Sequence, residues 1–144
     1  MAGRDFPLSA DEILPHRPPM LLIDRLVEGG GGEGLTETVI GRDHLFLEEG
    51  RLHPAALLEM MAQSFAAVKG LEDRKRGQAP ARGFLVGVKG LHWYGQAEAG
   101  DRLRVWVKKV GETEEFVLAE ARVEREGQVL AEGTIMVYVP QEAR

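Results

Sequence analysis

The sequence predicts an α+β fold in which an antiparallel sheet wraps around one long helix. Residues 54–69 have the features of a helix and are apolar on nearly every side, so this helix belongs in the interior. The other structured segments have the composition of β-strands, and those in the C-terminal half alternate between apolar and polar residues. One buried helix among five or six antiparallel strands is an α+β arrangement.

The elements before this helix are short. Ser9 and Glu12 have the spacing of a capping box, which predicts a short helix at that point. A buried strand is predicted over residues 20–27, with residues 35–41 as its hairpin partner. The glycines of residues 30–34 predict a flexible turn, because glycine tolerates positive φ angles. A phosphate-binding loop would need a helix directly after the glycines, whereas β-forming residues follow them here.

The long helix and the later strands have recognisable boundaries. Residues 42–53 predict a loop of mixed charge before the helix. Pro54 in the first turn and Gly70 just past the last residue are typical of a helix over residues 54–69. Residues 71–82 are polar and predict a surface loop. Four further strands are predicted, over residues 83–93, 103–110, 116–126 and 129–139.

Length and composition exclude several classes of protein. The chain has 144 residues, so we expect one domain over residues 1–144, with 44% hydrophobic and 28% charged residues as in globular proteins. The absence of cysteine excludes disulfides, zinc-thiolate sites and thiol nucleophiles. A net charge of -5 disfavours nucleic-acid binding. With neither a secretory signal nor the run of about 20 apolar residues that a membrane span needs, we expect a cytoplasmic protein, without metal or cofactor.

The long helix also predicts an oligomer. Its apolar residues at positions 55–58, 60–62 and 65–68 leave no continuous polar face. One small sheet cannot enclose a helix on all sides. We therefore expect a second copy of the chain to cover the remaining face, in a homodimer or a higher homo-oligomer.

Glu59 is the chemically informative residue of this helix, because it is the only acidic residue between Glu49 and Glu72. Burying a carboxylate is costly, and desolvation favours its protonated form. Gln63 lies one turn later on the same face and is placed to hydrogen-bond it. Glu59 is thus a candidate general acid. The structural alternative is a glutamate paired with an arginine or exposed at the edge of the helix.

Four histidines are candidate bases: His16, His44, His53 and His92. A lone histidine often has a structural role. His92 fits a surface position on a strand, and His53 can be simply the residue that enters the helix. The local sequence does not separate the four, and any of them that faces a protonated glutamate would form a base and acid pair at neutral pH.

Four blocks of the sequence together carry a family resemblance. The first is Leu-Pro-His-Arg-Pro-Pro-Met-Leu-Leu-Ile-Asp-Arg-Leu, residues 14–26, and the second is Leu-Glu-Met-Met-Ala-Gln, residues 58–63. The third is Gly-Phe-Leu-Val-Gly-Val-Lys, residues 83–89, and the fourth is Gly-Asp-Arg-Leu, residues 100–103. In sequence, order and spacing the blocks resemble the 3-hydroxyacyl-[acyl-carrier-protein] dehydratases.

This resemblance implies a hotdog fold, in which an antiparallel sheet wraps around one long central helix, and a dimer whose sheets join edge to edge. It also implies a catalytic pair formed across the dimer by a loop histidine and a helix glutamate. The glutamate corresponds to Glu59 and the histidine to His44, with His16 and His53 as alternative bases. The family's His-Phe-Pro-Gly motif is changed here, since the Pro-Gly is missing. This departure resembles a divergent branch of hotdog dehydratases, some of them linked to aryl-polyene pathways.

The activity that the resemblance implies is dehydration of a 3-hydroxyacyl thioester to a trans-2-enoyl thioester. His44 would take the C2 proton and Glu59 would protonate the leaving 3-hydroxyl group. The backbone N–H of Gly87 would stabilise the thioester oxygen, since glycine lets a substrate approach the backbone closely. The following residues could line an acyl tunnel, with core packing as the alternative: Leu57, Met60, Met61, Phe65 and Phe84.

The expected partner is an acyl carrier protein bearing the thioester, with acyl-CoA as the alternative. Because carrier proteins and this chain are both acidic, docking needs a local cationic patch. The candidates are Arg74, Lys75, Arg76 and Arg82, which otherwise form a solvated loop. Two other functions fit the same scaffold: thioester hydrolysis, with Glu59 acting alone, and non-catalytic acyl binding.

Overall fold

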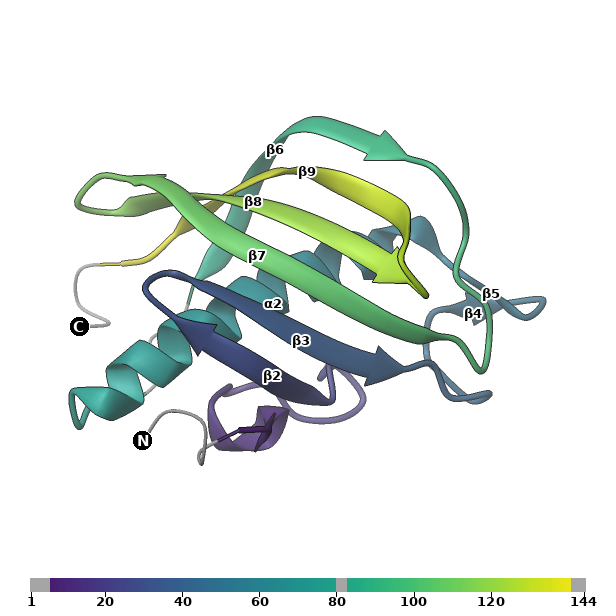
Figure 1. The fold of residues 1–144 in the computed structure, drawn as a ribbon, viewed down its shortest axis with the longest axis horizontal. Coiled ribbons are helices and arrows are strands. Elements are labelled where there is room, and N and C mark those ends of the chain that lie inside the picture. The colour runs from purple at the N-terminus through teal and green to yellow at the C-terminus, as the bar shows by residue number, and fades with distance from the viewer. Residues whose placement is uncertain (1–5, 80–82, 141–144) are drawn as a thin grey trace.

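A curved antiparallel sheet covers one side of a long helix in the computed structural model, which describes residues 6–79 and 83–140 (Figure 1). Within these residues the main sheet has seven strands in the order β1-β2-β3-β7-β8-β9-β6, and all neighbours are antiparallel. The helix is α2, Pro54–Lys75. The strands of this sheet are β1 (Leu8–Ser9), β2 (Arg25–Gly30), β3 (Glu33–Val39), β6 (Phe84–Trp93), β7 (Arg102–Glu112), β8 (Phe116–Arg125) and β9 (Gln128–Tyr138). The predicted α+β arrangement is confirmed.

The hydrophobic core lies between α2 and the face of the sheet that curves around it (Figure 1). Strand β7 shows how the sequence produces this face, because Leu103 and Val105 are buried whereas Arg102 and Arg104 are exposed. Successive side chains of a strand point to opposite faces, so the alternation places one set in the core. The predicted strands of the C-terminal half are therefore found within one or two residues of their expected ends.

Helix α2 is longer than predicted. It continues to Lys75, so Gly70 lies inside the helix and not just past its end. The reason is a close approach: a Cβ atom on Gly70 would lie 2.1 Å from the carbonyl oxygen of Ile13. Glycine serves packing against the N-terminal segment here, and the surface loop predicted over residues 71–82 is wrong for its first five residues.

The first strand of the main hairpin also differs from the prediction. Strand β2 begins at Arg25, so the strand predicted over residues 20–27 is wrong in its first part. The N–H of Leu22 donates to Oε1 of Gln63 on α2 at 2.8 Å and not to a neighbouring strand. Leu22 and Ile23 are nevertheless buried in the core, which explains their apolar character.

The glycine-rich segment forms the expected turn between β2 and β3. Gly31 and Gly32 have φ angles of 62° and 82°, a region that glycine adopts without strain. Strand β3 follows directly, so a phosphate-binding loop at a helix N-terminus is not formed. A 3-10 helix over Ala10–Glu12 follows Ser9, whose N–H donates to the carboxylate of Glu12 at 3.0 Å.

Two short strands lie in the loop before α2. They are β4 (Leu47–Glu48) and β5 (Arg51–Leu52), which pair with each other and which the sequence did not predict. Among the described residues, no helix is long and apolar enough to cross a membrane.

Candidate active site

A small cavity lies along α2 and contains the predicted acid. Its volume is about 60 Å³. Glu59 and Gln63 of α2 line it together with His16, which belongs to the loop before β2. The remaining lining comes from α2 and from the segments of β6 and β9: Ala62, Phe65, Ala66, Lys69, Gly83, Leu85, Val137 and Val139. One largely apolar cavity is therefore shared by four residues singled out in the sequence: His16, Glu59, Gln63 and Phe65.

The side chain of Gln63 organises this cavity. It is buried, with 1% of its surface exposed. Its Nε2 donates to the carbonyl oxygen of Met20 and to Oε2 of Glu59, both at 2.8 Å, and its Oε1 accepts the N–H of Leu22 at 2.8 Å. One side chain thus ties the loop before β2 to the helix and orients Glu59.

Glu59 is half-buried at the cavity wall. Its hydrogen bond with Gln63 is the contact that the spacing of the two residues predicts. Within residues 6–79 and 83–140, its Oε1 atom has no hydrogen-bond partner and neither oxygen has an arginine or lysine partner. The alternative of a glutamate held in an arginine pair is therefore not found in the described part of the chain.

His16 is held by its neighbours in the loop. Nη1 of Arg17 folds back and donates to the carbonyl oxygens of Leu14, at 2.8 Å, and His16, at 2.7 Å. His16 lines the cavity, and its Nδ1 atom is buried without a hydrogen-bond partner among the described residues. Buried polar atoms are normally paired, so this nitrogen requires an explanation.

His44 lies in the loop before β4 and does not line the Glu59 cavity. Its Nδ1 accepts the N–H of Phe46 at 3.0 Å. Burial lowers the pKa of the His44 ring below the usual histidine value, while Asp24 and Asp43 act in the opposite direction. The single chain thus does not bring His44 and Glu59 together. In the dimer that the family resemblance implies, the two would come from opposite subunits.

The other two histidines have evident local surroundings. His53 precedes α2, and its Nδ1 accepts the N–H of Ala55 at 3.1 Å, as a capping residue does. His92 is exposed on β6, where its ring stacks on that of Tyr94 with 6.2 Å between the ring centroids. Neither ring lines the cavity of Glu59.

Gly87 lies on β6, at an irregularity in the pairing of this strand with β9. A Cβ atom there would meet only Met136, at 3.9 Å, so packing within the chain does not require glycine. Strand β6 is the last strand in the sheet order and pairs only with β9 among the described strands. The backbone at Gly87 is therefore open to a ligand or to a second chain.

The candidate tunnel residues fall into three groups. Met60 and Met61 are fully buried and Leu57 is nearly so, in agreement with core packing. Phe65 belongs to the core and also lines the cavity. Phe84 is 51% exposed on β6 and lies outside the cavity lining.

The candidate docking residues lie at the C-terminal end of α2. Arg74, Lys75 and Arg76 are exposed there, a position where the helix dipole favours positive charge. Arg74 lies 4.0 Å from Glu12, which is a weak surface ion pair. Arg82 lies outside the described residues.

The burial of Glu37 was not anticipated from the sequence. Glu37 on β3 has 4% of its surface exposed and forms ion pairs with Arg25, Arg102 and Arg104. Its hydrogen bond with Arg25 lowers the pKa of the Glu37 carboxyl group most strongly, burial opposes this shift, and Arg104 adds to it. The alternation of β3 placed Glu37 on the outer face, but its arginine partners are far apart in sequence. The cluster joins three strands away from the cavity.

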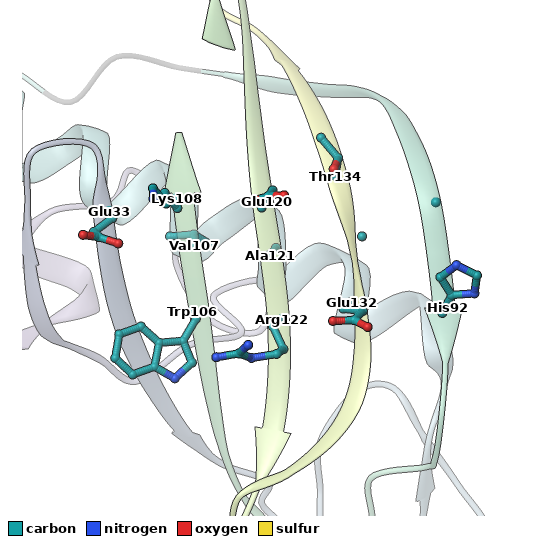
Figure 2. A pocket seen from close by; sticks show the side chains of 12 residues that line it. Glu33, His92, Trp106, Val107, Lys108, Glu120, Ala121, Arg122, Glu132 and Thr134 are labelled. Atoms are coloured by element: carbon teal, nitrogen blue, oxygen red, sulfur yellow. The ribbon is translucent and has the colours of Figure 1, made fainter. Parts of the chain in front are cut away.

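A second hollow in the described part of the molecule lies away from the cavity of Glu59. A groove of about 480 Å³ crosses the outer face of the sheet, on the side away from α2 (Figure 2). Trp106 of β7, Arg122 of β8, Glu132 of β9 and His92 of β6 line it. Of the four candidate bases, only His92 lines this groove, and Glu59 does not. Among the described residues no three histidine, aspartate or glutamate side chains are grouped to hold a metal ion.

Comparison with known proteins shows relatives over almost the whole chain. A 3-hydroxyacyl-[acyl-carrier-protein] dehydratase FabZ of Brucella abortus (strain S19) is 30% identical over 133 residues, which cover 88% of this chain and 83% of that protein. The protein of the same name in Streptococcus sanguinis (strain SK36) is 27% identical over 138 residues, covering 92% of this chain and 96% of the relative.

Solved structures agree with these relatives. A chain of the dehydratase heterocomplex ApeI:P from Xenorhabdus doucetiae superposes with a TM-score of 0.86 at 26% identity, over 92% of this chain and 91% of that one. A hypothetical thioesterase from Streptococcus pneumoniae TIGR4, solved with coenzyme A, shares the fold alone, with a TM-score of 0.63 and 12% identity over 80% of this chain and 84% of that one. The hotdog fold implied by the four sequence blocks is thereby confirmed. The family model described as ApeP-like, ApeP dehydratase, matches residues 8–144, and the chain belongs to this dehydratase family.

Proposed function

We propose that the chain dehydrates 3-hydroxyacyl thioesters to trans-2-enoyl thioesters, with the acyl group carried by an acyl carrier protein or by coenzyme A. The observation that carries this proposal is the position of Glu59 in a small, largely apolar cavity, where Gln63 holds one carboxylate oxygen and the other is left available. An oriented carboxylic acid beside apolar walls suits protonation of a leaving hydroxyl group on an acyl chain.

In the proposed reaction His44 removes a proton from C2 of the acyl group. The electrons form the C2–C3 double bond as the C3–O bond breaks, and Glu59 gives its proton to the departing oxygen, which leaves as water. The backbone N–H of Gly87 stabilises the negative charge that develops on the thioester oxygen. Burial of the His44 ring supports its role, because its lowered pKa keeps the ring neutral and able to accept a proton.

The site is proposed to be completed in a homodimer or a higher homo-oligomer. Two features support this: β6 ends the sheet with an unpaired edge in the described structure, and Phe84 and Val86 of this strand are 51% and 53% exposed. Pairing of two β6 strands would cover these side chains and bring His44 towards Glu59 of the partner subunit. A second, different hotdog chain is the alternative partner, since the structural relative from Xenorhabdus doucetiae is a heterocomplex.

The carrier protein is proposed to dock on the cationic end of α2, at Arg74, Lys75, Arg76 and Arg82. The first three are exposed, and acyl carrier proteins are acidic, so the charges are complementary. We further propose that residues 1–144 form one domain and that the protein acts in the cytoplasm, because the described segments share one main sheet and core and the substrate is a carrier-bound thioester.

Product analysis tests the proposed reaction. The chain is incubated separately with a 3-hydroxyacyl thioester and with the saturated acyl thioester of the same length. Formation of enoyl thioester from the first supports the proposal. Release of free thiol would instead identify a thioesterase, and binding without any product would identify an acyl-binding subunit.

The substitution Glu59→Gln keeps the shape of the side chain and removes the acid. We expect normal folding and a loss of dehydration of roughly 10²–10⁴-fold, the usual contribution of a general acid. Glu72→Gln, on the same helix but away from this cavity, is the matched control and should keep the parental rate. Parental activity in Glu59→Gln would show that Glu59 is structural.

A further inference from the structure

Within the described residues, the Nδ1 atom of His16 is buried without a hydrogen-bond partner, and His16 is one of the residues that line the cavity of Glu59. Leaving such an atom unpaired is costly unless a ligand or water completes it. We propose that His16 binds the 3-hydroxyl group of the substrate in this cavity. The inference rests on the proposed function and adds to it a residue that recognises the group to be eliminated.

The loop geometry fixes His16 in this place. Arg17 donates to two carbonyl groups of the loop, at Leu14 and at His16 itself. Gln63 bonds the same loop twice, through the carbonyl oxygen of Met20 and the N–H of Leu22. Four hydrogen bonds therefore hold the backbone of the loop that carries His16 beside the cavity. A loop that is already ordered loses less entropy when a ligand binds.

The other polar atoms of the cavity already have partners. All three hydrogen bonds of Gln63 go to the loop and to Glu59, and Nζ of Lys69 lies 3.4 Å from Asp73. Among the described residues, the ring nitrogens of His16 and Oε1 of Glu59 are side-chain atoms of this cavity that have no hydrogen-bond partner. The rest of the lining is mainly apolar. The cavity thus fits a hydrocarbon segment with one polar substituent, as in a 3-hydroxyacyl chain.

The chemistry of the elimination assigns a direction to the contact. Glu59 must deliver its proton to a lone pair of the hydroxyl oxygen, so the hydroxyl hydrogen has to point elsewhere. Nδ1 of a neutral His16 can accept that hydrogen, which turns a lone pair of the oxygen towards Glu59. In this arrangement His16 binds the substrate while His44 acts as the base, and the enoyl product, which has no hydroxyl group, loses the contact with His16.

Ligand binding without turnover tests the inference. In full chains that carry Glu59→Gln, dissociation constants are measured by calorimetry for 3-hydroxyoctanoyl-CoA and octanoyl-CoA. We expect the hydroxylated ligand to bind about tenfold more tightly, as one hydrogen bond to a buried group allows. Adding His16→Phe should abolish this preference, because it removes the hydrogen bond to the 3-hydroxyl group. Octanoyl-CoA has no such hydroxyl group, so its affinity should change by no more than about twofold.

Two further variants separate recognition from structure. His16→Asn places an amide oxygen near the position of Nδ1 and should restore part of the preference, whereas His92→Phe, at an exposed histidine of β6, should leave it intact. Equal weakening of both ligands by His16→Phe, or an unchanged preference, would overturn the inference. So would the absence of a preference in the Glu59→Gln chain. Failure of the proposed reaction would appear separately, as a parent chain that forms no enoyl product.

Discussion

The side chain of Gln63 connects the loop before β2 to Glu59 on α2, and its removal should affect both the stability of the fold and the orientation of Glu59. Gln63→Met keeps the length and the apolar stem but leaves the buried N–H of Leu22 without a partner, and the carbonyl of the exposed residue Met20 loses its bond to Gln63. An unsatisfied buried group costs about 1–3 kcal/mol, so we expect the free energy of unfolding to fall by about that amount. Urea unfolding measures this change.

The matched control is Gln78→Met, because Gln78 is exposed after the end of α2. Its free energy of unfolding should stay within about 0.5 kcal/mol of the parent, as for most surface substitutions. A similarly small effect of Gln63→Met would mean that water replaces the three hydrogen bonds, and that Glu59 does not depend on this residue for its orientation.

His44 gives the chain a pH dependence whose direction is defined. In the folded chain, burial lowers the pKa of the His44 ring below the ordinary histidine value of 6.5. The ring therefore stays neutral as the pH falls through 6.5. Because the folded pKa lies below the unfolded one, the related stability is present above pH 6.5 and is lost as the pH falls through the folded pKa. In an NMR titration assigned with His44→Gln, the His44 ring should protonate below 6.5.

The kinetic counterpart follows if His44 is the base. The acid limb of kcat/KM should then also lie below pH 6.5, and His44→Gln should lose turnover while still binding acyl thioester. Parental turnover in His44→Gln would remove His44 from the mechanism. The alternative bases His16 and His53 would then be examined by the same variants.

Helix α2 depends on Gly70 for its approach to the N-terminal segment. Alanine is about 1 kcal/mol more favourable than glycine inside an isolated helix. Here the added Cβ atom would lie 2.1 Å from the backbone oxygen of Ile13, which cannot move as a flexible side chain does. We expect Gly70→Ala to lower the free energy of unfolding by about 1–3 kcal/mol, the usual cost of overpacking.

A second glycine serves as the control in the same denaturation experiment. A Cβ atom on Gly111 of β7 would make only an ordinary contact with Leu118, at 3.8 Å. Gly111→Ala should therefore be neutral or slightly stabilising, because alanine reduces the entropy of the unfolded chain. If Gly70→Ala is equally neutral, the helix and the N-terminal segment can move apart at little cost.

The same glycine shows why part of the helix could not be predicted. A glycine after an apolar periodic segment is typical of a helix end, but it also permits close packing, and only the position of Ile13 distinguishes the two. The apolar residues 20–23 have a similar ambiguity, because burial without strand pairing has the same composition as a strand. The C-terminal strands were predictable because period-two alternation arises only where one face is buried.

Part of the candidate site could likewise be predicted from the sequence, and part could not. The pair of Glu59 and Gln63 could be predicted, since residues four apart on a helix are neighbours. The position of His16 beside Glu59 depends on how the loop before β2 returns to α2, and on hydrogen bonds between residues about forty positions apart. Such contacts cannot be predicted from the local sequence. The sequence alone therefore could not show which of the four histidines lies beside Glu59.

At the scale of the whole molecule, the edge of β6 is the feature that assembly would explain. Val86 of this strand and Val110 of β7 are similarly exposed, at 53% and 49%. If β6 pairs with a second copy, Val86→Lys should place a charge at the interface and shift the protein towards monomer, with loss of activity. Val110→Lys should leave the dimer intact, and sedimentation velocity at micromolar concentration distinguishes the two.

An active, compact monomer of the parent chain would contradict a site shared between subunits. A dimer that survives Val86→Lys would place the interface elsewhere on the molecule. Mass measurement of the native species also tests the alternative of a different hotdog partner, since a homodimer has twice the chain mass of 15.9 kDa.

The hairpin turn between β2 and β3 marks a position where the chain can change in length. A Cβ atom on Gly31 would meet nothing within 4 Å, and the residue is exposed. Lengthening such a loop costs only about 0.6 kcal/mol for each doubling of its residues. A peptide tag or a reporter domain can therefore be inserted at this tip. The loop that carries His16 has no such freedom, because its hydrogen bonds to Gln63 set its span.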